Sequence, residues 1–256
     1  MPSRLTKLMI FLIIAVAGVS AFSNENTPDE LLKSAAQALH FKNSKSTAVM
    51  KISRPGKEDE TRKLNMWFAS LSNGYKLVIK LSEPAKLSGT GFLTIKEGSE
   101  TASQWLYLPA YKKSRKIRRG NENESFVGSD FTFADLNFEN QSAYDFKIQG
   151  EAQCAPAVCH VLVGTTKSSG DSFGYSKKIF YIRKTDSLNV KTEYFDSSGK
   201  LVKLMTVTEG SGKEPKIKSL ELKDVTNGNK TVMEFVSHST EDKIADNVFS
   251  LSFLEK

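Results

Sequence analysis

Hydrophobic and polar residues alternate with a period of two along much of the chain between residues 47 and 222. The alternation is clearest in the segments 63–68, 75–81, 144–148 and 188–194. Successive side chains of a β-strand point to opposite faces, so this period is typical of strands that bury one face and expose the other. The pattern therefore predicts a mainly β protein.

Turn signals separate the predicted strands. The clearest are residues 72–74 (Ser-Asn-Gly), 196–199 (Asp-Ser-Ser-Gly) and 227–229 (Asn-Gly-Asn), all rich in residues that adopt tight turns. About 11 short strands in hairpin succession predict a single antiparallel sheet that curls toward a barrel. No segment with a helical period is long enough to cross over between parallel strands, which excludes a Rossmann-type fold.

The first residues have the composition of an export signal. Arg4 and Lys7 precede an apolar run, and small residues follow it. The run has about a dozen residues, whereas a membrane-spanning helix needs roughly 20. We therefore expect a signal peptide, cleaved near Ala21 or Ser23, rather than an uncleaved anchor.

Removal of this signal peptide, residues 1–21, would leave one mature domain at residues 22–256. The formal net charge would fall from +7 to +5, because the segment takes Arg4 and Lys7 and no acidic residue with it. No basic helix, zinc site or aromatic RNA-binding signature accompanies this charge, so we expect no nucleic-acid partner. A basic exported protein is better suited to anionic lipid headgroups or to an acidic protein face.

One amphipathic helix is predicted near the start of the mature chain. Thr27 and Glu30 form a capping box, and Pro28 occupies the first helical position. Apolar residues then recur at helical spacing, namely Leu31, Leu32, Ala35, Ala36 and Leu39. This helix either covers one side of a core or closes over a cavity as a lid.

Residues 105–136 combine an aromatic strand, a basic run and an aromatic loop. Pro109 ends the strand because it has no N–H to donate to a ladder. The basic run consists of Lys112, Lys113, Arg115, Lys116, Arg118 and Arg119. These cations either protect an edge strand from aggregation or dock an acidic partner or a membrane surface. The loop that follows is predicted to turn aromatic side chains inward, with Ser129 or Asp130 capping a short helical turn.

Cys154 and Cys159 are the only cysteines. An even number of cysteines in an exported chain predicts a disulfide, here at the end of a hairpin. Such a small loop should contribute roughly 2 kcal/mol. The spacing is not C-x-x-C, which argues against a redox catalyst. The histidines do not cluster with other ligands in the sequence, so we expect no metal site.

Signatures of catalysis are missing from the sequence. It has no G-x-S-x-G elbow, no H-E-x-x-H pair and no phosphate-binding loop. Gly-Thr-Gly at residues 89–91 lies between predicted strands with no helix after it, which indicates a turn or bulge. We therefore expect a protein that is not an enzyme and that uses no cofactor.

Five segments carry a family resemblance. They are EPAKLSGTGFL (83–93), YLPA (107–110), SFVGSDFTFADL (125–136), CHVLVGTT (159–166) and YFDSSGKLVKL (194–204). In this order they resemble the LolA-like outer-membrane lipoprotein-sorting family of bacterial periplasmic proteins. The resemblance implies a half-open antiparallel barrel with short helices acting as a lid, and a location in the periplasm.

The resemblance also implies that the concave face holds an acyl chain, a lipoprotein or another amphipathic ligand. The inward residues of the predicted strands are large, and aromatic and methionine side chains are typical of an adaptable apolar cavity. The candidate lining residues are Met66, Phe68, Tyr75, Leu77, Phe92, Tyr144, Phe146, Met233 and Phe235. The alternative is that the same side chains simply fill the barrel.

Two main functional hypotheses follow from the sequence. In the first, the protein is a periplasmic carrier for transport or sorting toward the outer membrane, and it meets an inner-membrane transporter or an outer-membrane acceptor. In the second, it is a non-enzymatic adaptor or sensor that binds a protein partner and has a filled core. A hydrolase with an unrecognised site is a third.

Overall fold

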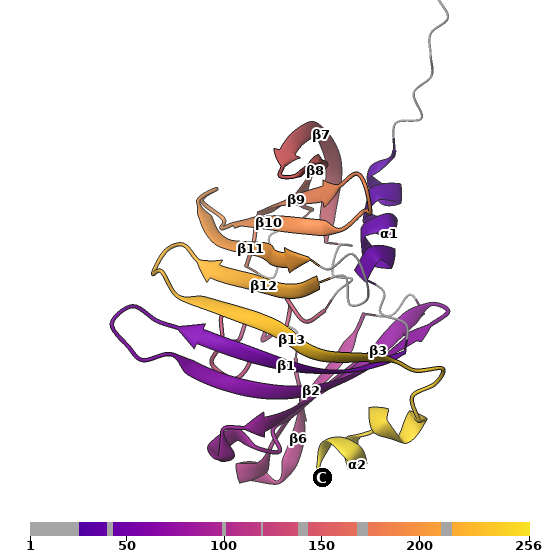
Figure 1. Ribbon diagram of the computed structural model, residues 1–256, viewed down its shortest axis with the longest axis vertical. Coiled ribbons are helices and arrows are strands. Elements are labelled where there is room, and N and C mark those ends of the chain that lie inside the picture. The colour runs from indigo at the N-terminus through magenta and orange to yellow at the C-terminus, as the bar shows by residue number, and fades with distance from the viewer. Residues whose placement is uncertain are drawn as a thin grey trace, which may run out of the picture.

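The computed structural model describes residues 26–39, 43–98, 101–118, 120–137, 143–167, 174–210 and 217–256. The predicted signal peptide, residues 1–21, lies outside them. The described residues form one curved antiparallel sheet of 13 strands, in the order β6-β5-β4-β3-β2-β1-β13-β12-β11-β10-β9-β8-β7 (Figure 1). The sheet does not close on itself, so the predicted half-open, mainly β fold is confirmed, with 13 strands where about 11 were expected.

The strands follow one another as two meanders. The first contains β1 (Ser44–Ser53), β2 (Glu60–Leu71), β3 (Gly74–Glu83), β4 (Gly91–Glu97), β5 (Ser103–Leu108) and β6 (Lys113–Lys116). The second contains β7 (Tyr144–Cys154), β8 (Ala157–Thr166), β9 (Lys177–Arg183), β10 (Asn189–Phe195), β11 (Leu201–Gly210), β12 (Ile217–Asp224) and β13 (Lys230–Thr240). The pairing of β1 with β13 joins the two meanders.

The connection between β6 and β7 shapes the interior. These two strands form the opposite edges of the sheet, so the chain between them must cross the concave face. Phe126, Phe131, Phe133 and Leu136 from this connection pack against the inward side chains of β1–β5 and of β12 and β13. The Phe92 ring lies 5.5 Å from the ring of Phe126 and 5.6 Å from that of Phe133. The prediction of a loop that turns aromatic side chains inward is therefore confirmed.

Two capping bonds lie within this connection: the predicted Ser129 accepts the N–H of Phe131 at Oγ (3.2 Å), and Thr132 caps the turn that follows. Thr132 donates its backbone N–H to Asp135 Oδ2 (2.8 Å), and the Asp135 N–H donates to Thr132 Oγ1 (3.2 Å). Asp130 instead bonds to Thr231 of β13 through both its N–H and its carboxylate. The turn is too short to be a helix, and these bonds attach the connection to the sheet.

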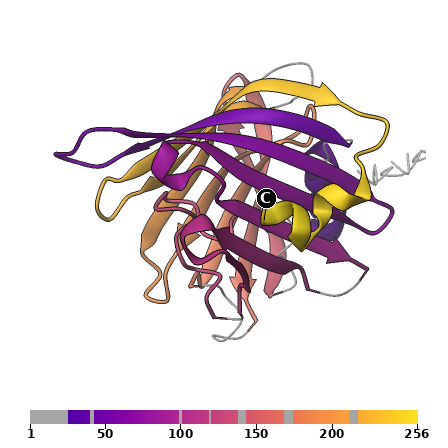
Figure 2. The same cartoon turned by 90° about the horizontal axis from the view of Figure 1, so that it is seen from below.

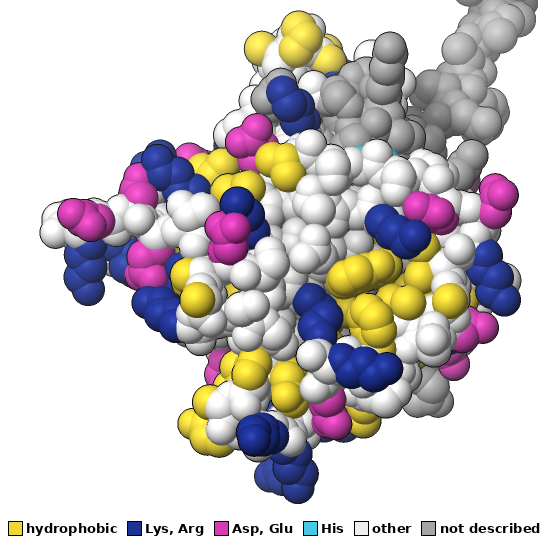
Figure 3. All heavy atoms as spheres, turned by 60° about the horizontal axis from the view of Figure 1, so that its bottom comes forward, with side chains coloured by type: hydrophobic (Ala, Val, Ile, Leu, Met, Phe, Trp, Pro, Cys, Tyr) yellow, Lys and Arg dark blue, Asp and Glu magenta, His cyan; other side chains and the backbone are white. Residues whose placement is uncertain are grey.

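The C-terminal segment covers the convex face of the first meander. It contains η3 (Asp246–Phe249) and α2 (Leu251–Leu254), which lie against β2–β5 (Figure 2). Phe249 and Leu254 are buried there against Val78 and Leu93. Figure 3 shows hydrophobic side chains gathered on the face that carries α2, with lysine and arginine side chains around them. Since α2 packs on the outside of the sheet, it does not face the concavity.

A second helix, α1 (Pro28–Leu39), lies beside the upper strands of the sheet (Figure 1). Its predicted capping box is present, because Thr27 donates its N–H to Glu30 Oε2 (2.7 Å) and Glu30 donates its N–H to Thr27 Oγ1 (3.3 Å). Leu31 and Ala35 bury their side chains against β8 and β9. The amphipathic stripe thus places α1 over the second meander. None of the helices in the described part of the chain has both the length and the apolar character to cross a bilayer.

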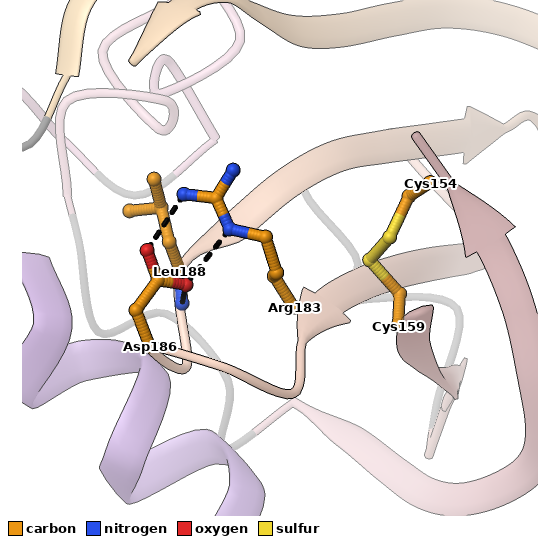
Figure 4. Close-up of a disulfide and its surroundings, with 5 residues drawn as sticks. All are labelled: Cys154, Cys159, Arg183, Asp186 and Leu188. Carbon is orange, nitrogen blue, oxygen red and sulfur yellow. Dashed lines mark hydrogen bonds and ion pairs between the residues drawn. A yellow bond between two sulfur atoms is a disulfide. The ribbon is translucent and has the colours of Figure 1, made fainter. Parts of the chain in front are cut away.

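The predicted disulfide joins Cys154 and Cys159, with 5.9 Å between their Cα atoms. It lies at the end of the β7–β8 hairpin, where Cys159 is fully buried and faces Arg183 of β9 across the ladder. Arg183 makes two bonds to Asp186, which also accepts the N–H of the buried Leu188 (Figure 4). The disulfide and this ion pair together fix the ends of β7–β10.

Candidate functional site

The structure divides the predicted lining residues between two regions of the concave face. Phe68, Tyr75, Leu77, Phe92 and Met233 belong to the core beneath the β6–β7 connection, and each is at most 8% exposed. Met66 and Phe235 lie partly buried at the margin of that core. Tyr144 and Phe146 lie on the far side, on the edge strand β7. The nine residues therefore do not form one continuous surface.

The region around β7–β11 keeps large side chains within reach of solvent. The ladder register aligns one row of side chains across these strands, namely Ile148, Leu162, Phe180, Thr192 and Met205. Phe146 and Phe180 are only partly buried, their rings are 5.8 Å apart, and both pack beside α1. We define this row, with Phe146, as the apolar row.

Gly164 allows the ring of Phe146 to lie flat on the sheet. Phe146 and Gly164 are directly paired in the β7–β8 ladder. A Cβ atom at position 164 would overlap the Phe146 ring. The absence of a side chain at position 164 therefore lets the Phe146 ring lie against β8. The other face of the ring is available to a neighbouring group.

Next to the apolar row lies a second row that carries charge. The register pairs Gly164 with Lys178, Lys178 with Tyr194, and Tyr194 with Lys203. The ammonium of Lys178 lies over the rings of Tyr144 (4.7 Å to the centroid), Tyr194 (5.6 Å) and Tyr175 (5.7 Å). We call these three tyrosines, with Lys178, Lys203 and Asp135, the lysine–tyrosine cluster.

Asp135 reaches this cluster from the β6–β7 connection. Its Oδ2 atom accepts from Lys203 Nζ (2.8 Å), and both side chains are at most 10% exposed. The same oxygen accepts from the backbone N–H and the hydroxyl of Thr132. Lys203 and Asp135 therefore neutralise each other, and Lys178 is left as the unpaired charge among the described residues of the cluster.

Burial changes the acidity of several groups here. Burial lowers the pKa of Lys178 to about 8, with Lys203 acting in the same direction and Asp135 opposing it. Burial lowers the pKa of Lys203 as well, but Asp135 and Tyr175 together outweigh burial, so this pKa is raised. Burial raises the pKa of Tyr144 and of Tyr194 well above the usual value. Near neutral pH the cluster thus holds neutral phenols and cationic lysines.

Sequence reasoning named Tyr144 but missed the rest of this cluster. Lys178 follows Lys177 at the start of a strand, and such a pair is typical of a solvated strand end. The alternation does contain a usable signal, because Lys178 shares its face with Phe180 and Ile182. A lysine on the apolar face of a strand is unusual, and it marks the site.

An open groove of about 1000 Å³ lies along β7–β9. Val163, Ile179 and Lys177 line it, and they alternate with the residues of the concave face. Phe146 is the one predicted lining residue that touches this groove. The groove meets the apolar row at Phe146 and Ile148, but its other apolar residues lie on the opposite face of the strands, so an experiment must distinguish the two surfaces.

The basic run lies on and around the edge strand β6. Lys112, Lys113, Lys116 and Arg118 are exposed, and Arg119 lies outside the described residues. Arg115 pairs with Glu124 (3.0 Å), and Lys116 lies over the ring of Trp105 (5.4 Å). Most of this run thus presents its charge to solvent at the free edge of the sheet.

In the described residues, no group of His, Cys, Asp and Glu could hold a metal ion.

Residues 74–256 match the model of a family that carries the description "uncharacterized protein". The chain belongs to this family. No curated protein matches the chain in sequence.

Solved structures identify the fold. A DUF1329 family protein from Desulfovibrio piger ATCC 29098 has a TM-score of 0.79 at 24% identity, over 89% of this chain and 97% of its own. A domain from Vibrio parahaemolyticus, described as a putative outer membrane lipoprotein-sorting protein, has a TM-score of 0.78 at 22% identity, over 90% and 100%. A LolA superfamily protein from Nitrosomonas europaea has a TM-score of 0.67 at 14% identity, over 90% and 100%. The fold of this chain is therefore LolA-like, as its sequence motifs indicated.

Proposed function

We propose that the protein is a periplasmic carrier that holds the acyl chain of a lipid or lipoprotein against the apolar row, beneath α1. The observation that carries this proposal is the half-buried pair Phe146 and Phe180, which α1 covers only in part. The LolA-like fold supports it, because one solved structure of this fold is described as a lipoprotein-sorting domain. In this proposal residues 1–21 direct export, and binding requires no catalysis.

Burial of a hydrocarbon chain provides the driving force. Each methylene removed from water contributes about 0.8 kcal/mol, so a chain of about 14–16 carbons offers on the order of 10 kcal/mol before the costs of association. The core beneath the connection takes up the inward face of β1–β5 and parts of β11–β13, which leaves β7–β10 to provide this surface. Release then needs a competing site or a movement of α1, whose packing on the sheet involves mainly Leu31 and Ala35.

Two neighbouring residues of β9 test this location. We expect Phe180→Glu to weaken binding of the fluorescent acyl probe cis-parinarate about tenfold or more, because a charge replaces an apolar contact. The free energy of unfolding should fall by only about 1–2 kcal/mol, since the position is half-buried and a charge there can stay hydrated. Fluorescence titration and urea unfolding of the purified mature protein measure both quantities.

Ile179→Glu is the matched control, because Ile179 is equally half-buried but lines the outer groove. Weaker binding for Ile179→Glu alone would move the ligand to that groove. Wild-type protein that binds no probe, and that carries no lipid in native mass spectra, would contradict the carrier proposal. That result would favour an adaptor that binds a protein partner through a filled core.

We further propose that the exposed cations of the basic run bring the carrier to an anionic membrane surface or to an acidic partner there. Five of the six positions are described, and only Arg115 pairs with a carboxylate among the described residues. Each lysine near an anionic surface contributes roughly 1 kcal/mol. An edge strand needs fewer cations than this to avoid aggregation.

Charge reversal tests the docking surface. The triple variant Lys112→Glu, Lys113→Glu and Lys116→Glu should bind phosphatidylglycerol vesicles about a hundredfold more weakly at low salt. The difference should nearly vanish at about 1 M salt, where screening is short-ranged. Reversal of the exposed Lys57, Lys86 and Lys223 changes the net charge equally and serves as the control. Equal loss in both variants would mean that net charge, rather than this edge, attracts the vesicle.

A further inference from the structure

We propose that Lys178 recognises an anionic head, a carboxylate or a phosphate group, of the ligand whose chain lies on the apolar row. This inference rests on the proposed carrier function and specifies the chemistry of its ligand. It assigns a binding role to the lysine–tyrosine cluster, where the connection, β7 and β9–β11 come together.

The hydrogen-bonding capacity of Lys178 is the first observation. Its ammonium has three N–H donors, yet it donates no hydrogen bond to any residue that the structure describes. Its neighbours are the rings of Tyr144, Tyr175 and Tyr194, and ring faces attract a cation without accepting a full hydrogen bond. An anionic oxygen would supply the missing acceptor.

The charge balance of the cluster is the second observation. Asp135 is already used, because one of its oxygens accepts from Lys203 and twice from Thr132. The described charges of the cluster are therefore two cations and one anion. The Tyr194 and Tyr175 rings are tilted against each other with their centroids 4.9 Å apart, and they lie beside both lysines. A ligand anion would bring this partly buried region to neutrality.

The register gives the third observation, which relates the cluster to the apolar row. On β9, Lys178 and Phe180 are two residues apart and share a face. On β7, Phe146 is in line with Lys178 through Gly164, and its ring lies 5.8 Å from that of Phe180. Two residues of a strand span about 7 Å. The concave face thus places a cationic row beside an apolar row, which matches the two ends of an amphipathic ligand. Lys178 is itself only partly buried, so solvent can reach it.

The test compares ligands that differ only in the head group. Wild-type protein should bind cis-parinarate about tenfold more tightly than its uncharged methyl ester, and 1-oleoyl lysophosphatidate should displace the ester better than monoolein by a similar factor. If only cis-parinarate is preferred over its neutral partner, the ligand carries a carboxylate. If only lysophosphatidate is preferred over its neutral partner, the ligand carries a phosphate group. Equal binding within both pairs would overturn the inference and leave the carrier proposal intact. Failure of even the neutral ligands to bind would contradict the carrier proposal itself.

Two variants locate the effect. Lys178→Met should reduce the preference for the charged ligand to about twofold or less, with ester binding unchanged. Lys177→Met is the matched control, because Lys177 lies on the opposite face over the ring of Phe195 (3.9 Å) and should keep the preference. An unchanged preference in Lys178→Met would overturn the assignment. Unchanged binding of the methyl ester also shows that each variant is folded.

The pH dependence gives a second readout. Affinity for cis-parinarate should fall as the pH rises through about 8, the pKa of Lys178 in the free protein, because the neutral amine no longer attracts the carboxylate. Asp135, Lys203 and the three tyrosines face Lys178, and the raised pKa values of the tyrosines keep them neutral in this range. Lys178→Arg keeps its charge at every accessible pH and should bind independently of pH from roughly 7 to 9. A fall of the same size in Lys178→Arg would overturn the role of this ammonium.

Discussion

Replacing Phe133 with alanine should destabilise the fold by about 3–5 kcal/mol, the usual cost of deleting a fully buried aromatic ring. Phe133 is 1% exposed and packs between the rings of Phe92 and Phe126. Its carbonyl, which accepts from Gln104 (2.9 Å), stays in place in the variant. The loss therefore reports the packing of the side chain alone, and urea unfolding of the mature protein measures it.

Tyr111→Ala is the control for this measurement, because Tyr111 is an aromatic residue that is 76% exposed. Its removal should change the free energy of unfolding by about 0.5 kcal/mol or less. A loss below about 1 kcal/mol for Phe133→Ala would mean that the connection only rests on the sheet. The connection would then be able to move aside, and the concave face of the first meander would again be a candidate for the ligand.

The filling of the first meander also bears on where this half-open barrel has room for the proposed ligand. The connection fills one half of the concavity with its own aromatic side chains, and α1 covers the other half with a single apolar stripe. A ligand can displace α1 at a lower cost in free energy than the connection, because α1 buries few side chains on the sheet. We therefore place the ligand under α1 rather than under the connection.

The sequence predicted the strands of the fold better than it predicted which inward residues form the core and which stay accessible. Alternation identified which residues of each strand point inward, and Phe68, Leu77 and Phe92 do so. It did not show that β6 and β7 are opposite edges, because strand order is a long-range property. That order sends residues 117–137 across the concavity, and it decides which inward residues become core. Several of the predicted lining residues therefore lie in the core beneath the connection.

The cationic part of the site could not be predicted for a similar reason. Lys178 and Lys203 lie on different strands, and Asp135 lies in the connection, so their meeting depends on the complete sheet. The alternation of β9 is consistent with an inward Lys178, but only the register of β9 with β10 puts Tyr194 beside it. The capping residue Thr132 was missed because Ser129 and Asp130 also fit a cap. Ser129 does accept the N–H of Phe131, whereas Asp130 bonds to Thr231.

The second large effect is expected at the ion pair between Lys203 and Asp135. Lys203→Met should destabilise the protein by about 3–5 kcal/mol, because it leaves the Asp135 carboxylate buried without its countercharge. The pair also attaches the connection to β11, through Asp135 Oδ2 and Lys203 Nζ at 2.8 Å. Asp135→Leu should cost a similar amount, since it leaves the buried ammonium unpaired and removes the acceptor for Thr132.

The double variant separates the pair from its surroundings. Lys203→Met with Asp135→Leu buries no unpaired charge, so its loss of stability should be smaller than the sum of the single losses by about 2–3 kcal/mol. Purely additive losses would show that the two charges do not interact in the folded protein. The pH dependence of stability follows from the raised pKa of Lys203 in the folded protein. The stabilisation by Lys203 is complete below the pKa that this lysine has in the unfolded chain. It is lost as the pH rises through the pKa of the folded state. Chemical unfolding at neutral pH therefore measures the full effect of the ion pair on stability. Because Lys203 neutralises Asp135, the charge of Lys178 remains available to a ligand.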